Sequence, residues 1–145
     1  MLCFFNDNDI RLLSNSSVLS LSSDILYAPL IHGCTSVLYE GKPVNTPDSG
    51  AFWRVASEYK ARCIFSAPTA FRAIRKEDNN AELMEQYDMT NLKSVMVAGE
   101  RCDPPTLEWL GKILPAANIV DNFWMTETGS PVLGNPVSNG IRDDD

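Results

Sequence analysis

Basic residues are scarce in this chain of 145 amino acids. Lys and Arg together number 12 against 19 Asp and Glu, which gives a formal net charge of -7 and a pI near 4.6. A nucleic-acid surface needs clustered basic residues to neutralise phosphates, so this balance argues against nucleic acid as a partner. An acidic chain is still compatible with a nucleotide pocket, because helix dipoles, backbone N–H groups and a metal ion supply local positive potential.

Long apolar runs and closely spaced cysteine pairs are also missing. No apolar run approaches the roughly 20 residues that a membrane helix requires, so no membrane span is expected. The four cysteines lie 29 to 39 residues apart, which fits neither a zinc site nor a small disulfide scaffold. Free thiols in a reducing compartment are the simplest interpretation. The N-terminus carries no convincing signal peptide, and we expect a soluble intracellular protein.

The length allows one domain, with segments of different composition at its two ends. Residues 1–24 are polar and Ser-rich without a clear period, and we expect a flexible or atypical N-terminal segment. Residues 25–133 carry regular alternation and form the predicted domain, followed by a polar tail over residues 134–145. A mitochondrial transit peptide would be rich in Arg and poor in acids. Residues 1–24 contain only Arg11 as a basic residue, which does not favour one.

Apolar, β-branched stretches alternate with helical patterns between residues 25 and 133. Strands are predicted over residues 35–39, 63–67, 92–98 and 119–124. Helices are predicted after Asp48 and after Asp103 as capping residues, over residues 69–76, and as a short acidic helix over residues 81–87. Strand starts roughly 25 to 31 residues apart are typical of right-handed βαβ units. The predicted fold class is therefore α/β, with a mostly parallel sheet and flanking helices.

Polar or turn-forming residues follow each predicted strand, and ligands of parallel sheets bind beyond the carboxyl ends of the strands. The fourth end is the richest, since Ile119–Asn122 leads into Phe-Trp-Met-Thr-Glu-Thr-Gly. Its carboxylate and hydroxyl oxygens suit a phosphate and its magnesium ion. The alternative is a surface strand that ends in an ordinary Gly129-Ser130-Pro131 turn.

Five motifs, taken in order, resemble acyl-CoA synthetases of the adenylate-forming, AMP-binding superfamily. The similarity is to the short-chain branch that activates acetate and propionate, and it covers residues 25 to about 133. The motifs are Tyr27-Ala28-Pro29-Leu30 with His32-Gly33, Tyr39-Glu40-Gly41-Lys42-Pro43, Ala67 to Ile74, Ala98-Gly99-Glu100-Arg101, and Trp124-Met125-Thr126-Glu127-Thr128-Gly129.

The resemblance implies a two-step ligase reaction. A carboxylate attacks the α-phosphate of ATP to give an acyl-adenylate and pyrophosphate, and the thiol of coenzyme A then displaces AMP. The first step joins two anions and so needs Mg²⁺ and aligned hydrogen-bond donors. The implied ligands are therefore ATP and AMP, Mg²⁺, coenzyme A and a small carboxylate.

The resemblance also implies roles for residues at the phosphate and acyl ends of the site. Glu127 matches the magnesium ligand, and Thr126 matches the residue whose hydroxyl and backbone touch the α-phosphate. Trp124 matches the indole that floors the acyl pocket, where it would admit acids of two or three carbons. Without the motif around it, Trp124 would be assigned to the core.

A second set of implied roles concerns the adenine. Gly99, Glu100 and Arg101 match the turn that lies along the base, and Asp121 matches the acid beside it. Arg72 either approaches coenzyme A or covers the edge of the sheet, and the pattern does not assign it to the site.

The chain also departs from the family pattern. It lacks the Ser/Thr- and Gly-rich phosphate loop, the aspartate that holds the ribose and the C-terminal domain with its adenylation lysine. We therefore expect an internal fragment of a longer enzyme, inactive alone and a possible partner of the full-length enzyme.

Two other interpretations stay open, together with the substrate and the compartment. The chain is alternatively a non-catalytic nucleotide- or partner-binding module, or an unrelated α/β domain with chance motifs. Acetate and propionate both fit above one indole. The residues of the motifs favour the mitochondrial members of the family, and the cytosol remains an alternative location.

Overall fold

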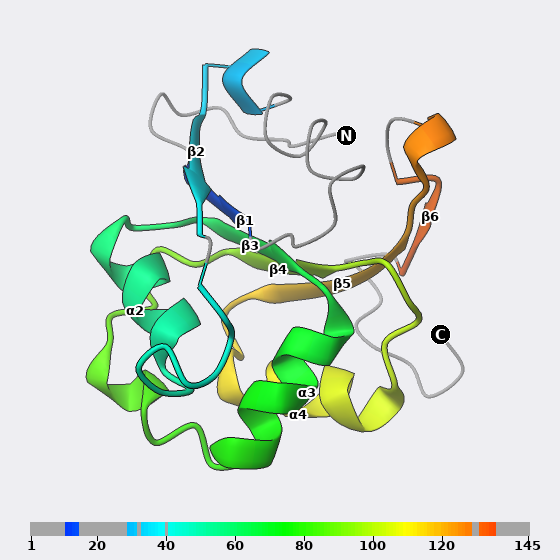
Figure 1. Ribbon diagram of the computed structural model, residues 1–145. Helices are drawn as coiled ribbons and strands as arrows, with labels where there is room; N and C mark the ends of the chain where they lie inside the picture. The colour runs from blue at the N-terminus through cyan, green and yellow to red at the C-terminus, as the bar shows by residue number, and fades with distance from the viewer. Residues whose placement is uncertain (1–10, 15–28, 32, 40, 129–130, 136–145) are drawn as a thin grey trace.

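One six-stranded sheet organises the part of the chain that the computed structural model describes, which is residues 11–14, 29–31, 33–39, 41–128 and 131–135 (Figure 1). The strand order is β2-β1-β3-β4-β5-β6. The first five strands pair in parallel, and β6 is antiparallel to β5. Their bounds are Arg11–Ser14 (β1), Thr35–Leu38 (β2), Cys63–Ser66 (β3), Ser94–Val97 (β4), Asn118–Phe123 (β5) and Leu133–Gly134 (β6). The predicted α/β class with a mostly parallel sheet is confirmed.

The parallel register brings the carboxyl ends of neighbouring strands to the same edge of the sheet. Val97 at the end of β4 pairs with Asp121 in β5, and Ser66 at the end of β3 pairs with Val97. The segments that follow β3, β4 and β5 therefore leave the sheet on one side. This is the edge at which the sequence predicts a site.

Strand β1 is the element that the sequence pattern does not single out. It lies between β2 and β3, with Leu13 paired to Val37 on one side and to Ile64 on the other. The expected flexible or atypical N-terminal segment thus contains four residues of the parallel sheet. A strand of four residues between polar stretches is too short to show a period, and its pairing is non-local. The rest of residues 1–24, and residues 136–145 of the predicted tail, lie outside the described residues.

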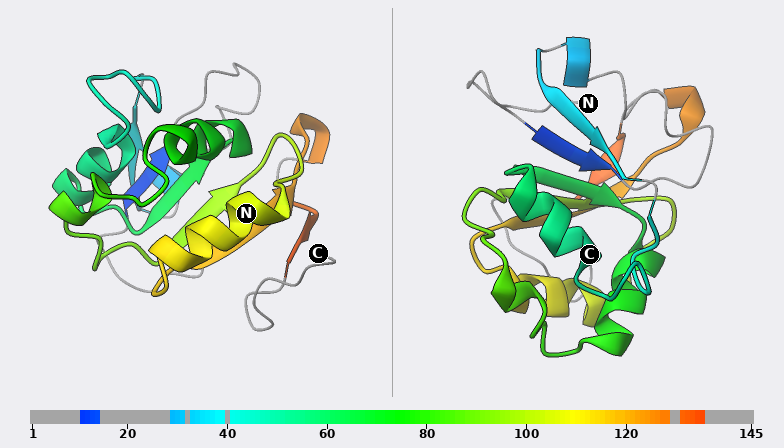
Figure 2. Two further views of the ribbon diagram at one scale, coloured as in Figure 1. Left: turned by 90° about the horizontal axis from the view of Figure 1, so that it is seen from below. Right: turned by 60° about the vertical axis from the view of Figure 1, so that its left-hand side comes forward.

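Three α-helices cover one face of the sheet, as Figures 1 and 2 show. They are α2 (Ala51–Glu58), α3 (Pro68–Glu77) and α4 (Pro104–Ile113). Two short 3₁₀ helices accompany them, η1 (Met84–Gln86) and η2 (Thr126–Thr128). The predicted short acidic helix over residues 81–87 is therefore a single 3₁₀ turn. In the described part of the chain, no helix combines the length and the apolar character needed to cross a bilayer.

The predicted caps have different outcomes. Asp103 caps α4 as expected, because its Oδ2 accepts hydrogen bonds from the Thr106 N–H at 3.2 Å and from the Thr106 hydroxyl at 2.8 Å. Asp48 was predicted to cap α2, and this is wrong. Gly50 is the N-cap, and the Asp48 carboxylate instead accepts from the Gly50 N–H at 2.8 Å. It therefore closes the turn before the helix.

The main core lies between the sheet and the three helices. Phe71 of α3 is fully buried, with its ring centroid 5.9 Å from that of Phe52 and 6.4 Å from that of Trp53, both in α2. Strand residues such as Ile64 and Val95 complete this core from the sheet. Trp53 and Trp109 pack in this core.

A smaller apolar cluster occupies the opposite face of the sheet. Side chains alternate between faces along a strand, so Cys63 and Phe65 point away from Ile64 and from the main core. Ala98 and Trp124 join them, and Trp124 meets Phe65 edge to face with ring centroids 5.6 Å apart. Trp124 is therefore held by packing at the end of β5.

Candidate functional site

A cavity of about 610 Å³ opens at the carboxyl ends of β4 and β5. Its size is within the range of small-molecule pockets. Five of the seven residues that the sequence assigns to a site line it together, whereas Glu127 is not among the described lining residues. The described residues that line it are Gly99, Glu100, Arg101, Leu107, Asp121, Asn122, Phe123, Trp124, Leu133, Gly134 and Asn135.

The turn after β4 forms one wall of the cavity. Gly99 has a φ of +101°, a backbone conformation that side-chain-bearing residues rarely adopt. Apart from its two chain neighbours, no described residue comes within 4 Å of the position that a Cβ would occupy there, so open space lies beside the backbone. Glu100 and Arg101 follow and are exposed. The turn thus presents open backbone to the cavity, with two charged side chains in the cavity lining.

Asp121 forms the opposite wall and is tied to that turn. Its Oδ2 accepts a hydrogen bond from the Cys102 N–H at 3.2 Å. Burial raises the pKa of the Asp121 carboxyl above its ordinary value, and the Cys102 N–H and the Arg101 charge only partly offset this. A half-buried carboxylate in a pocket wall is suited to accept a hydrogen bond from a ligand.

Asn135 supports Asp121 from the other side. Its Oδ1 accepts from the Asp121 backbone N–H at 2.7 Å, and its Nδ2 donates to the Ile119 carbonyl at 3.2 Å. One side-chain amide thus binds two backbone groups of β5, as a residue of a neighbouring strand would do. This fixes the backbone of Asp121 within the cavity wall.

Trp124 closes the cavity at the end of β5. Its side chain is only 6% exposed, and its indole N–H has no hydrogen-bond partner among the described residues. It thus combines a role in the small apolar cluster with a place in the cavity lining. Both sequence-based interpretations of Trp124, as packing residue and as pocket residue, are compatible with this position.

The phosphate-end candidates lie in η2, which follows the end of β5. Glu127 is exposed, and Thr126 begins the same 3₁₀ turn. The turn is closed locally, since the Thr128 N–H and hydroxyl both donate to the Met125 carbonyl, at 3.1 and 2.7 Å. Because η2 follows β5 and the turn containing Gly99 follows the adjacent parallel strand β4, both segments leave the same sheet edge.

A metal ion at this edge would depend on few protein ligands. Within the described ranges, no three His, Cys, Asp or Glu side chains gather closely enough to hold a metal by themselves. Mg²⁺ at nucleotide sites usually takes one or two carboxylates, substrate phosphates and several waters. The single exposed carboxylate of Glu127 fits that donor set.

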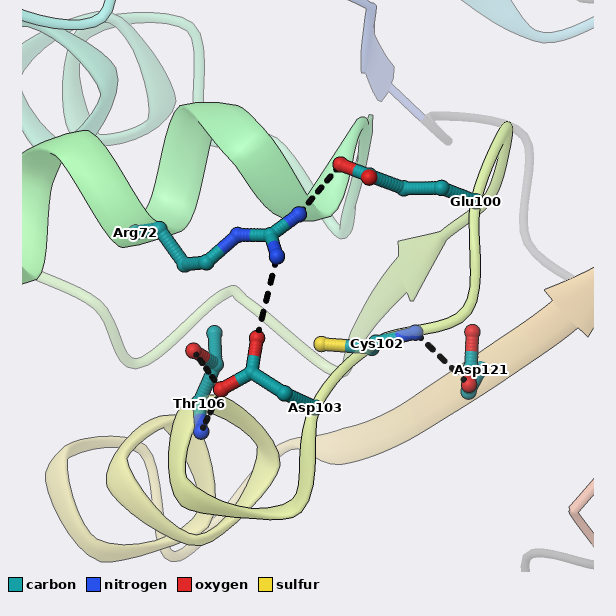
Figure 3. Close-up of polar contacts among 6 residues, drawn as sticks. All are labelled: Arg72, Glu100, Cys102, Asp103, Thr106 and Asp121. Atoms are coloured by element: carbon teal, nitrogen blue, oxygen red, sulfur yellow. Dashed lines mark hydrogen bonds and ion pairs between the residues drawn. The ribbon is translucent and has the colours of Figure 1, made fainter.

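Arg72 is a residue at the site that the sequence pattern left unassigned. From α3 its guanidinium forms an ion pair and hydrogen bond with Glu100, and a second ion pair with Asp103 at 3.3 Å (Figure 3). The hydrogen bond to Glu100 raises the pKa of Arg72. The available signal was an Arg in one motif, Glu100 in another and the helix-cap residue Asp103 shortly after it. Their pairing across 28 and 31 positions is visible only in the fold.

Cys102 lies between these groups but is not equipped as a nucleophile. Its side chain is 1% exposed, and burial together with the Asp121 and Asp103 charges raises the pKa of its thiol to about 12. The reactive form of cysteine is the thiolate, which this environment disfavours. Cys102 therefore contributes its backbone N–H to the site, and its sulfur packs in the main core.

Comparison with known proteins gives consistent matches. The AMP-binding enzyme family model matches residues 6–144. The mitochondrial acyl-CoA synthetase short-chain family member 3 of Mus musculus and that of Homo sapiens are each 52% identical to this chain over 118 residues. That alignment covers 81% of this chain and 17% of each relative. The propionate–CoA ligase of Escherichia coli (strain K12) is 37% identical over 121 residues, covering 83% of this chain and 18% of the ligase. The chain thus spans less than a fifth of the length of these relatives.

Proposed function

Because the chain belongs to the AMP-binding enzyme family, we propose that it supplies part of the active centre of a short-chain acyl-CoA synthetase. Such an enzyme joins a short-chain carboxylate to coenzyme A at the expense of ATP. The observation that carries this proposal is the clustering of five of the seven candidate residues around one cavity at the carboxyl ends of β4 and β5. Chance motif matches in an unrelated α/β domain are excluded by the family match over residues 6–144.

In the proposed site the adenine of ATP lies between the turn after β4 and the strand β5. The open backbone at Gly99 lets the flat base approach closely, with Glu100 and Arg101 along it. Asp121 accepts a hydrogen bond from the exocyclic amino group of the base. Among these purines only adenine carries an amino donor at C6, where hypoxanthine and guanine carry a carbonyl. The contact therefore selects adenine against both.

The phosphates extend from this wall toward η2. There Thr126 contacts the α-phosphate, and Glu127 holds a magnesium ion together with the phosphate oxygens. A bound Mg²⁺ supplies charge neutralisation at the phosphate that the carboxylate attacks. Glu127 would hold the Mg²⁺ ion at the edge of the sheet. Because its side chain is exposed, it can do so without displacing core side chains.

Trp124 limits the length of the acyl group. One methylene of burial contributes only about 0.8 kcal/mol, so attraction alone separates acids of neighbouring length poorly. A rigid indole excludes longer chains by overlap, and the packing of Trp124 against Phe65 keeps it in place. Acetate and propionate are both substrates on this proposal.

Trp124→Gly in the complete enzyme tests the proposed acyl pocket. Removing the indole should shift the preference from acids of two or three carbons toward longer acids, measured as kcat/KM over a series of chain lengths. Met125→Ala is the matched control, because Met125 is exposed next to Trp124 and is not among the cavity-lining residues. An unchanged chain-length preference in the Gly variant would remove Trp124 from the pocket.

The 145-residue chain made alone is expected to form no acyl-AMP from ATP and propionate, since it spans 17% of the length of its relatives. AMP binding without turnover, measured by calorimetry, fits a partial active centre. It equally fits the second candidate, a non-catalytic nucleotide- or partner-binding module, so a different measurement must separate the two. Co-purification with a full-length synthetase would favour the second. We propose a mitochondrial location on the names of the relatives, testable by imaging a tagged protein.

A further inference from the structure

The side chain of Arg72 connects α3 to the turn after β4. Arg72 leaves the first half of α3 (Pro68–Glu77), and its guanidinium reaches across to residues that precede α4 (Figure 3). The backbone joins the two strand ends just before these segments, since the Ala98 N–H donates to the Ser66 carbonyl at 3.2 Å. Beyond that bond, Arg72 of α3 contacts the turn through its side chain.

The guanidinium bridges two carboxylates that are three residues apart. One nitrogen bonds Glu100, a residue of the cavity lining, and the other lies 3.3 Å from Oδ1 of Asp103. Oδ2 of the same Asp103 caps α4 through Thr106. The planar fork of Arg suits two acceptors at a fixed separation, and the single ammonium of Lys does not. The turn between Glu100 and Asp103 is thus held at both of its ends.

The same turn is fixed at its centre from the opposite side. There the Cys102 N–H donates to Asp121, in the other wall of the cavity. Arg72 on one side and Asp121 on the other therefore set how far the turn stands from β5. That separation is the width of the cavity at the place where the base is proposed to bind.

Stability alone does not account for this arrangement. The side chains of Arg72 and Glu100 are 39% and 42% exposed, and ion pairs of that exposure contribute little to the free energy of unfolding. Their effect falls on geometry instead, because a Gly-containing turn with a φ of +101° has more accessible conformations than other turns. Without the Arg72 bridge, Glu100 and its neighbours can adopt those other backbone conformations.

We propose that Arg72 is a positioning residue that holds the turn over residues 99–103 at the distance from Asp121 which adenine requires. The inference rests on the proposed function, since it assigns Arg72 a role in base recognition at that same site. Arg72 does not itself touch the nucleotide. It acts through Glu100 and Asp103.

The test uses the purified protein and three variants. Arg72→Gln removes the fork and its charge, and Arg72→Lys keeps the charge alone. Arg75→Gln is the matched control, because Arg75 lies on the same helix and forms no ion pair with a described residue. Calorimetry measures binding of AMP and of inosine monophosphate, and hydrogen exchange measures the protection of the amides over residues 99–103.

The expected result is a loss of adenine selectivity. Arg72→Gln should weaken AMP binding about 3- to 10-fold and inosine monophosphate binding much less, with faster exchange of the Cys102 amide. Arg72→Lys should be intermediate, and Arg75→Gln should match the wild type. A purely structural effect would weaken both nucleotides equally.

Each other outcome overturns a specific statement. If the wild type binds AMP and Arg72→Gln binds both nucleotides with unchanged affinity or equal losses, the positioning role is wrong and the proposed function stands. If the wild type binds neither nucleotide, the nucleotide site itself is wrong, and the role of Arg72 falls with it.

Discussion

Two segments leave the same edge of the sheet, and they are held in different ways. The turn over residues 99–103 after β4 is fixed by partners from α3 and β5, which are 19 to 31 residues away in the sequence. The 3₁₀ turn η2 after β5 is closed by bonds from Thr128 to Met125, only three residues away. A site built from both combines a wall fixed by long-range contacts with a turn that also closes on itself.

This difference matches the two kinds of ligand chemistry that are proposed there. Recognition of a base depends on fixed spacing between hydrogen-bond groups, which long-range contacts provide. A magnesium ion with phosphate oxygens brings its own strong charges and organises an exposed carboxylate such as Glu127 on binding. The following predictions separate the two segments, and they are ordered by their expected effect on the free energy of unfolding.

The largest effect is expected from Phe71→Ala, which removes the fully buried ring next to Arg72 on α3. Truncations of this kind lower the free energy of unfolding by about 3–5 kcal/mol. Both segments should then lose hydrogen-exchange protection together, because the main core supports the sheet beneath each of them. Chemical denaturation measures the free energy of unfolding. Selective loss at one segment would show that the other does not depend on this core.

Asp103→Ala should have a smaller and more local effect. It removes the α4 cap and one partner of Arg72, and the loss of a cap lowers the free energy of unfolding by about 0.5–2 kcal/mol. Exchange should rise over residues 99–103 and stay unchanged at η2. Asp103→Ser is the control, because Ser keeps a cap acceptor without the charge. Equal exchange changes in both segments would contradict the distinction between them.

The pH dependence of stability should have opposite signs for the two aspartates of this wall. Burial alone would raise the pKa of Asp103, but its bonds from Thr106 and the Arg72 charge lower it overall. Asp103 therefore stabilises the fold above its unfolded pKa, and this is lost as pH falls through the folded pKa. The raised pKa of Asp121 acts the other way, since stability falls as pH rises from the unfolded pKa through the folded pKa.

Denaturation at pH values from 3 to 7 in Asp103→Asn and Asp121→Asn measures these two contributions separately. The Asp103 variant should lose less stability on acidification than the wild type does. The Asp121 variant should lose less stability on going from acid toward neutral pH. Identical pH profiles in both variants would refute the assignment of opposite shifts.

The smallest effect on stability is expected from Glu127→Gln. Glu127 is exposed, so the free energy of unfolding should change by less than about 0.5 kcal/mol. Binding of ATP in the presence of Mg²⁺ should nevertheless weaken at least about 10-fold, while AMP binding without Mg²⁺ stays the same. Calorimetry with and without Mg²⁺ checks this, with Glu108→Gln as an exposed control on α4. Equal Mg²⁺ dependence in the variant and the wild type would rule out Glu127 as the metal ligand.

The sequence predicted those parts of the fold that depend on local pattern. The strands ending at Ser66, Val97 and Phe123 contain apolar residues that are buried on one or both sides of the sheet. Their composition and periodicity are therefore visible in the sequence. The cap at Asp103 is also local, since its partner Thr106 lies three residues on. The Asp48 prediction failed by two residues, because a capping residue and a turn residue before a helix have the same chemistry.

The sequence pattern does not reveal features that depend on contacts between distant parts of the chain. Strand β1 has only four residues and pairs with strands whose registers start 24 and 51 positions later, at Thr35 and at Cys63. The link from Arg72 to Glu100 joins two motifs that were recognised separately. The resemblance to family motifs identified the five candidate residues one by one. The rule that parallel strands end at the same edge of a sheet accounts for their gathering around one cavity.

The side-chain amide of Asn135 has a consequence for self-association. Unpaired backbone groups along the outer strand of a sheet can template the addition of a strand from another molecule, which begins aggregation. The outermost strand β6 pairs only with Asn122 and Phe123 of β5. Beyond those two residues, the Asp121 N–H and the Ile119 carbonyl are occupied by the Asn135 side chain, which offers no ladder of its own to an incoming chain. This short length of the sheet border is therefore blocked against growth by the same amide that steadies the cavity wall.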